Sequence, residues 1–208
     1  MLDRRIEATI GQNGEIKGSI AERASGGTSS LFRREARELS ASDYKKALEG
    51  WLTRGATGAQ LLKVEQNDRL AESGFDLNVD FSAAKYAQIM QGRLFIFKPV
   101  LVGRRDELAF TDEKRKAPVE INPTALKETA VFNLPAGFAV DEVPDAIQLS
   151  TPFGEYTTKY EVKGEQLIFT RMLTTKRATI SIDKYASVRE FFSKIRDAEQ
   201  SPVVLLKK

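Results

Sequence analysis

Alternation of apolar and polar residues is the sequence feature that most constrains the fold of this chain. Residues 6–10, 16–20 and 75–81 place apolar side chains at every second position. Successive side chains of a strand point to opposite faces, so this period predicts strands with one buried face. Asn13 and Gly14 lie between the first two runs and are typical of a tight hairpin turn. The chain is therefore expected to begin as antiparallel β structure.

Two segments instead carry the spacing of an amphipathic helix. The first covers 41–54, where Ser40 is the expected N-cap and Trp51 lies on the apolar stripe as a predicted core anchor. The second covers 183–199 and repeats the pattern near the end of the chain. Residues 30–37 are expected to form a further strand after Gly26 and Gly27.

These patterns predict an α+β protein with mainly antiparallel strands. The heavily charged segment 104–116 is the expected linker between two domains. The domains would cover 1–103 and 117–208, each a β-rich, sandwich-like unit with one covering amphipathic helix.

The chain contains neither cysteine nor histidine among its 208 residues. This excludes Cys-His and Ser-His-Asp catalytic groups and also zinc or haem sites held by these residue types. We expect no enzymatic activity and no cofactor. Disulfides are impossible, but the absence of cysteine is compatible with a reducing or an oxidising compartment.

Charge and hydropathy restrict the partners. The chain has 32 basic and 29 acidic residues spread along its length, so no basic patch indicates nucleic acid. The longest apolar run, 94–102, is interrupted by Lys98 and Pro99 and is too short to cross a bilayer. Met1 is followed directly by a strand pattern with no apolar signal segment. We expect a fragment of a longer polypeptide that does not insert into membranes.

Carboxylates are the remaining candidates for chemistry, because a pair of them can hydrolyse glycosides. Turn and hairpin positions hold two groups that we expect to be solvated: Asp141, Glu142 and Asp145, and Glu155, Glu161 and Glu165. Asp76, Asn78 and Asp80 alternate along one strand and lack the glycine-containing turn of a calcium loop, so a solvated strand face is expected. A free-standing carboxylate hydrolase stays open as a third hypothesis.

Tyr156 and Tyr160 share one face of a predicted strand. Such a pair can stack on a sugar ring, and half-buried tyrosines in a sheet have the same spacing. The two residues are the candidate ligand contacts of an alternative function, a carbohydrate- or peptide-binding β-sandwich, which could also use an open sheet edge.

The second half of the chain contains short segments whose order resembles the C-terminal region of large bacterial transglutaminase-like proteins. These segments are Arg115–Glu120, Phe132–Val140, Glu142–Pro144, Ser150–Tyr156, Val188–Phe192 and Val203–Leu205. Proteins of this kind combine a transglutaminase core, with its Cys-His-Asp triad, with flanking domains of unknown function and a β-rich tail.

The resemblance implies that the catalytic core lies outside this chain. It also implies a non-catalytic accessory role, in which the module packs on a transglutaminase-like core in the same polypeptide or recognises a protein partner. Members are typically exported or membrane-associated, so a periplasmic or extracellular location is expected.

Overall fold

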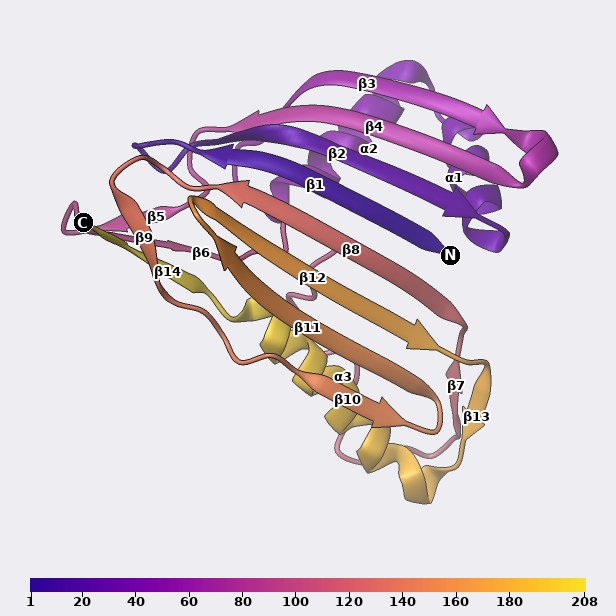
Figure 1. Cartoon of the computed structure of the whole chain (residues 1–208). Helices are drawn as coiled ribbons and strands as arrows, with labels where there is room; N and C mark the ends of the chain where they lie inside the picture. The colour runs from indigo at the N-terminus through magenta and orange to yellow at the C-terminus, as the bar shows by residue number, and fades with distance from the viewer.

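The computed structural model describes all 208 residues and has one dominant sheet. Its eight strands lie in the order β10-β11-β12-β8-β1-β2-β4-β3 (Figure 1). The strands are β1 (Leu2–Ile10), β2 (Ile16–Ser25), β3 (Gln60–Arg69), β4 (Gly74–Ala83), β8 (Thr124–Asn133), β10 (Gln148–Thr151), β11 (Gly154–Lys163) and β12 (Gln166–Thr175). Neighbouring strands are antiparallel except for β1 and β8, which are parallel. The expected α+β fold with mainly antiparallel strands is confirmed.

Two smaller sheets complete the β structure. A four-stranded sheet has the order β5-β6-β14-β9, and β13 pairs with β7 in a two-stranded sheet. Their strands are β5 (Gln88–Met90), β6 (Leu94–Phe97), β7 (Val119–Ile121), β9 (Phe138–Glu142), β13 (Ala178–Ile180) and β14 (Val203–Lys207). The four-stranded sheet packs on the large one: the ring of Phe97 in β6 lies 5.3 Å from that of Phe132 in β8.

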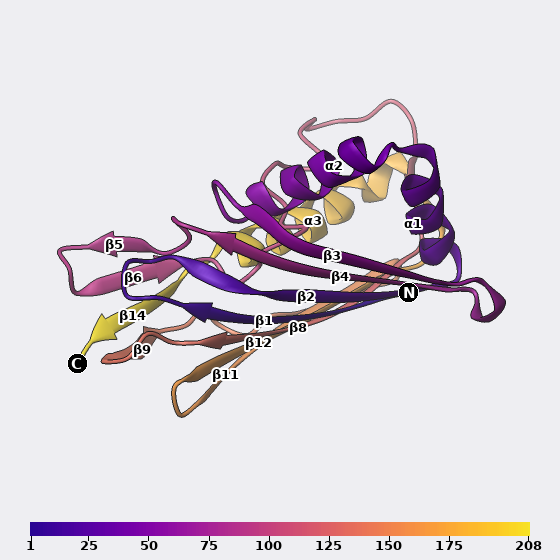
Figure 2. The same ribbon diagram turned by 90° about the horizontal axis from the view of Figure 1, so that it is seen from above.

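The helices α1 (Gly27–Glu38), α2 (Ala41–Thr53) and α3 (Tyr185–Gln200) lie on one face of the large sheet (Figure 2). Two short 3-10 helices, η1 (Leu70–Glu72) and η2 (Ile182–Lys184), complete the chain. Alternation explains this arrangement, because one side chain in two along β1 is buried, beginning with Arg4 and Ile6, and the others are exposed. No helix is both long and apolar enough to span a membrane.

The two halves of the chain are not separate sheets. β1 pairs with β8 over eight registered positions, and β14 lies between β6 and β9 in the smaller sheet. The expected division at 104–116 therefore separates two segments of one continuous sheet, although 104–116 itself contains neither helix nor strand. The charge and composition of 104–116 correctly indicated an irregular segment. The pairing of strands about 120 residues apart is not visible in the local sequence, so the continuity of the sheet was not predicted.

Residues 30–37 lie in helix α1 and not in the expected strand. Ser29, Phe32 and Ala36 recur at helical spacing, and Phe32 packs edge-on against Phe75 of β4. The Ser29 hydroxyl oxygen lies 2.7 and 2.6 Å from the carbonyl oxygens of Gly26 and Ser73, and its one proton serves either acceptor. Tertiary packing of this stripe thus determines the helix.

Helix α2 begins where the sequence predicts. The Ser40 hydroxyl accepts a hydrogen bond from the Asp43 backbone N–H at 3.1 Å. We expect Ser40→Ala to lower the free energy of unfolding by about 1 kcal/mol, because this N–H loses its partner. Urea unfolding measures the change, with Ser42→Ala as the control at an exposed first-turn position. Equal effects of the two substitutions would show that the cap does not stabilise α2.

Candidate functional site

A row of alternating charges crosses the inner face of the large sheet. Glu22 on β2, Arg4 on β1, Glu128 on β8 and Arg171 on β12 occupy directly opposed positions on four adjacent strands. All four are at least 95% buried. Glu199 on α3, also buried, extends the row beyond Arg171. We call these five residues the ionic row.

The ionic row is a continuous chain of short ion pairs. Arg4 donates to Glu22 at 2.6 Å and to Glu128 at 2.7 Å. Arg171 donates to Glu128 at 2.9 Å and to Glu199 at 2.7 Å. Each arginine therefore lies between two carboxylates, and Glu128 lies between the two arginines.

The loop 99–105 closes over the ionic row from the helix side. The Val102 carbonyl oxygen accepts from Arg4 at 3.2 Å and from Arg171 at 2.8 Å. Arg105 donates to Glu199 through its backbone N–H and its guanidinium, at 2.8 and 2.7 Å. Gly103, at a φ of 64° that favours glycine, lets this loop turn against the two buried arginines. The ion pairs and hydrogen bonds of the ionic row therefore connect the large sheet, α3 and the loop 99–105.

The row also separates two apolar regions of the core. The larger cluster contains Phe81, Phe97 and Phe132, and the smaller one contains Tyr156 and Phe191 under α3. Trp51 of α2 is half-buried at the edge of the larger cluster, and the Arg4 guanidinium lies 5.7 Å from its ring centre. The expectation that Trp51 packs on the core is confirmed.

The electrostatics of the carboxylates follow from their partners. Burial alone would raise the pKa of Glu128, but Arg171 and Arg4 outweigh it and hold the pKa below its usual value. Burial raises the pKa of Glu22, and its single partner Arg4 offsets this only in part. Burial opposes the charge of Arg171, but Glu128 and Glu199 more than compensate and raise its pKa. The two arginine contacts therefore favour the charged form of Glu128.

We expect Glu128→Gln to reduce the loss of stability in acid. A carboxyl with a lowered pKa in the folded state stabilises the fold above its ordinary pKa of 4.5, and this contribution is lost as pH falls through the folded-state pKa. Urea unfolding between pH 7 and pH 3 measures the difference. Glu22→Gln is the control, because a raised pKa has the opposite sign and its removal should not reduce the acid loss. Identical pH profiles for Glu128→Gln and the unmodified chain would contradict this assignment.

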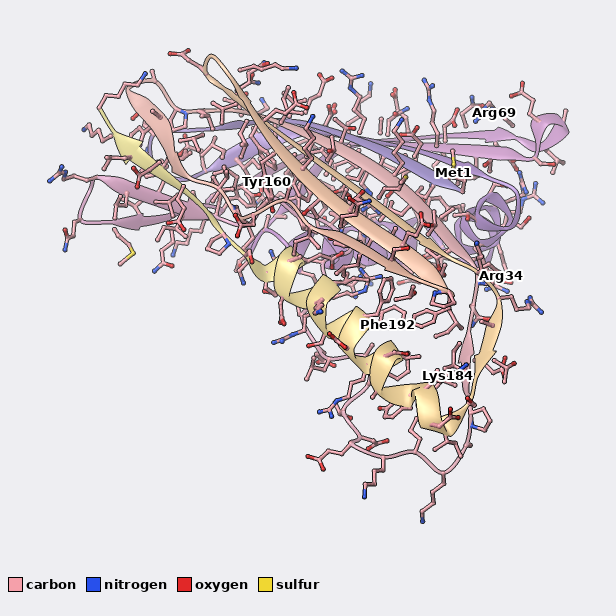
Figure 3. All side chains as sticks on the ribbon, turned by 60° about the horizontal axis from the view of Figure 1, so that its bottom comes forward. Met1, Arg34, Arg69, Tyr160, Lys184 and Phe192 are labelled. Carbon is pink, nitrogen blue, oxygen red and sulfur yellow. The ribbon has the colours of Figure 1, made fainter.

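The candidate ligand contacts do not form an exposed pair. Tyr156 is fully buried, and its hydroxyl donates to Glu199 at 3.5 Å, within the small cluster under α3. Tyr160, which Figure 3 labels, is half-buried. Its ring centre lies 5.1 Å from that of Phe169. The core interpretation of this spacing therefore holds, and Tyr156 has no free face for a sugar.

The candidate carboxylates lie on the surface. Asp141, Glu142, Asp145, Glu155 and Glu165 are exposed, and Glu161 forms ion pairs with Lys159 and Lys163 at 2.7 and 3.1 Å. Asn78 and Asp80 are exposed on the outer face of β4, as expected, whereas Asp76 is half-buried and accepts two hydrogen bonds from Arg69, both at 2.8 Å. No group of three or more acidic residues is placed to hold a metal ion.

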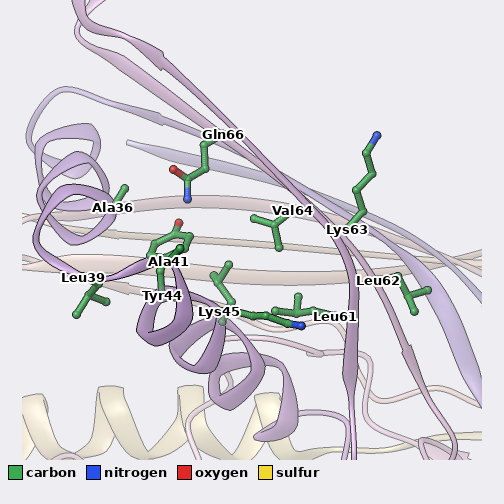
Figure 4. A pocket seen from close by; sticks show the side chains of 11 residues that line it. Ala36, Leu39, Ala41, Tyr44, Lys45, Leu61, Leu62, Lys63, Val64 and Gln66 are labelled. Carbon is green, nitrogen blue, oxygen red and sulfur yellow. The ribbon is translucent and has the colours of Figure 1, made fainter.

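An apolar groove lies at the edge of the sheet, between α2 and β3 (Figure 4). Its volume is about 460 Å³, and most of its lining is apolar. The lining residues are Ala36, Leu39, Ala41, Tyr44, Lys45, Leu48, Leu61, Leu62, Lys63, Val64 and Gln66. Burial raises the pKa of Tyr44, which lines the groove, to about 12.

The fold and these two features define an α+β module with one large, helix-covered sheet. Residues 92–205, more than half of the chain, match the family DUF3858, which is described as a domain of unknown function with a solved structure. The chain belongs to this family. No curated protein matches its sequence.

One solved structure resembles part of the chain. It is described as a putative protease from Parabacteroides distasonis, and the two chains are 14% identical with a TM-score of 0.47. The similarity covers 56% of this chain and 24% of that one, so the matched part is about a quarter of the other protein.

Proposed function

We propose that this chain is a non-catalytic accessory module of a larger transglutaminase-like polypeptide, in which it packs on the catalytic core or recognises a protein partner. The sequence resemblance supports the transglutaminase-like context. A periplasmic or extracellular location is part of the same proposal.

The observation that carries the proposal is that the ionic row is buried and its charged groups pair with one another. Arg4 and Arg171 together connect the row's three carboxylates, and the Val102 carbonyl oxygen of the covering loop accepts from both arginines. Glu128 Oε1 and Arg171 Nε are buried without a hydrogen-bond partner. A catalytic acid or base must reach a substrate atom. Here the charged groups face one another beneath the loop, which suits a structural crosslink. The module would then act through its surface, and the apolar groove beside β3 is a surface suited to binding a protein.

Binding to the separately produced core tests this proposal. The part of the same gene that encodes a catalytic core is expressed without residues 1–208, and the intact module is added in trans. We expect saturable binding by calorimetry and a higher melting temperature of the core, because a ligand of the folded state stabilises it. Turnover of an amide or glycoside substrate by the purified module alone would overturn the proposal, and absence of binding would overturn the packing of the module on the core.

A further inference from the structure

The edge strand β3 offers an unpaired row of backbone groups beside the apolar groove. It pairs only with β4 and is ten residues long, whereas the opposite edge strand, β10, has four residues. A long edge strand can accept a further strand through its free N–H and C=O groups. The register shift between Leu61 and Lys63 leaves Leu62 52% exposed at this edge.

The groove extends the surface that an added strand would cover. Leu61 and Val64 of β3 turn toward α2 (Figure 4). The buried Leu48 of α2 lines the same groove. One side chain in two of a strand laid along β3 would therefore point into an apolar space. This combination of a free edge and a flanking helix suits the strand-addition mode of peptide recognition.

The charged residues that line the groove indicate which peptides would bind there. Its charged lining residues are Lys45 and Lys63, and no carboxylate lines it. Lys63 is paired with Glu65 at 2.7 Å on the outer side of the strand. Lys45 is 62% exposed and lies 3.9 Å from Glu49, a distance at the limit of an ion pair. Lys45 is thus the cation available to a bound segment.

We propose that β3 binds an extended, acidic peptide segment of a partner protein as a ninth strand of the large sheet. Alternate apolar side chains of the peptide fill the groove, and a carboxylate of the peptide meets Lys45. This inference rests on the proposed role in protein recognition and specifies its site and the chemistry of the partner.

Selection from a display library of random peptides with the length of β3, using the intact chain, tests the inference. We expect enrichment of sequences with alternate apolar residues and at least one Asp or Glu. For an enriched peptide, Lys45→Glu should weaken binding by about fivefold, the upper range for an exposed ion pair. Lys159→Glu is the matched control, since Lys159 is similarly exposed but lies on β11, near the opposite edge of the sheet from β3, and its substitution should leave binding unchanged.

A backbone-methylated copy of the enriched peptide distinguishes binding by strand addition from binding through side chains alone. Methylation at alternate amides removes the ladder hydrogen bonds, and we expect at least about a tenfold loss of affinity from losing several such bonds. Amide exchange of residues 61–66 should slow only with the unmethylated peptide.

Four outcomes would overturn the inference: no enrichment, equal effects of the two lysine substitutions, full affinity of the methylated peptide, and self-association of the chain through β3 as the only binding observed. If the core binds in trans while any of these results is obtained, the accessory role stands and the strand-addition site is wrong.

Discussion

Arg171→Ala is expected to lower the free energy of unfolding by about 3–5 kcal/mol, the range for removing one partner of a buried ion pair. Arg171 is 2% exposed and bonds to Glu128, Glu199 and the Val102 carbonyl. Without the guanidinium, Glu199 retains Arg105 and Glu128 retains only Arg4, so buried negative charge is left undercompensated. Urea unfolding at pH 7 measures the change.

Arg34→Ala provides the comparison for this prediction. Arg34 is 65% exposed on α1 and forms a 4.0 Å pair with Glu38, so its removal should cost less than about 1 kcal/mol. If both substitutions cost the same small amount, the ionic row does not crosslink the fold as described.

Phe132→Ala is expected to cost a further large amount, about 3–5 kcal/mol, because a fully buried aromatic ring leaves a cavity. The Phe132 ring on β8 lies 5.3 Å from Phe97 of β6 and 6.2 Å from Tyr86. These contacts join the second half of the chain to the first. The variant should therefore lower the midpoint of one cooperative unfolding transition for probes in both halves.

Calorimetry and fluorescence of Trp51 follow that transition together. Val162→Ala is the control at a position 51% exposed on β11, where we expect an effect within about 0.5 kcal/mol. Two resolved transitions, with only the one assigned to residues 117–208 shifted by Phe132→Ala, would favour two independent domains over a shared sheet.

Local patterns predicted much of this fold. Period-two alternation indicated β1, β2 and β4, Asn13-Gly14 marked their first hairpin, and the capping serine placed the start of α2. These features are readable because each depends on neighbours a few residues apart. The parallel pairing of β1 with β8, by contrast, joins positions about 120 residues apart. Because of this pairing, the two halves of the chain form one sheet.

Two charged residues of the ionic row lie at sequence positions where the alternating pattern predicts a buried side chain. Arg4 falls on the same parity as the buried Ile6 of β1, and Glu128 on the same parity as Phe132 of β8. Charged residues at inward positions are rare unless paired, so both predict buried partners. The identity of those partners depends on the strand register, which the sequence does not reveal.

The sequence analysis allowed for binding at an open sheet edge but identified neither β3 as that edge nor the groove beside it. Leu61, Val64 and Leu48 look like ordinary core positions, and only the sheet order places β3 at an edge. The burial of Tyr156, a candidate ligand contact in the sequence, also depends on tertiary structure, because α3 packs over this side chain. Exposure at a sheet edge is a property of the topology and not of local composition.

Replacement of the whole ionic row by apolar residues tests most directly whether these charges serve structure alone. Arg4 and Arg171 become methionine, and Glu22, Glu128 and Glu199 become leucine, in one variant of the intact chain. A structural row predicts a variant that still folds cooperatively and binds the core in trans with unchanged affinity. Its stability gains less than in other replacements of buried ion pairs by apolar groups, because the Val102 carbonyl and Arg105 lose their partners in the row. A variant that folds normally but no longer binds the core would contradict the account.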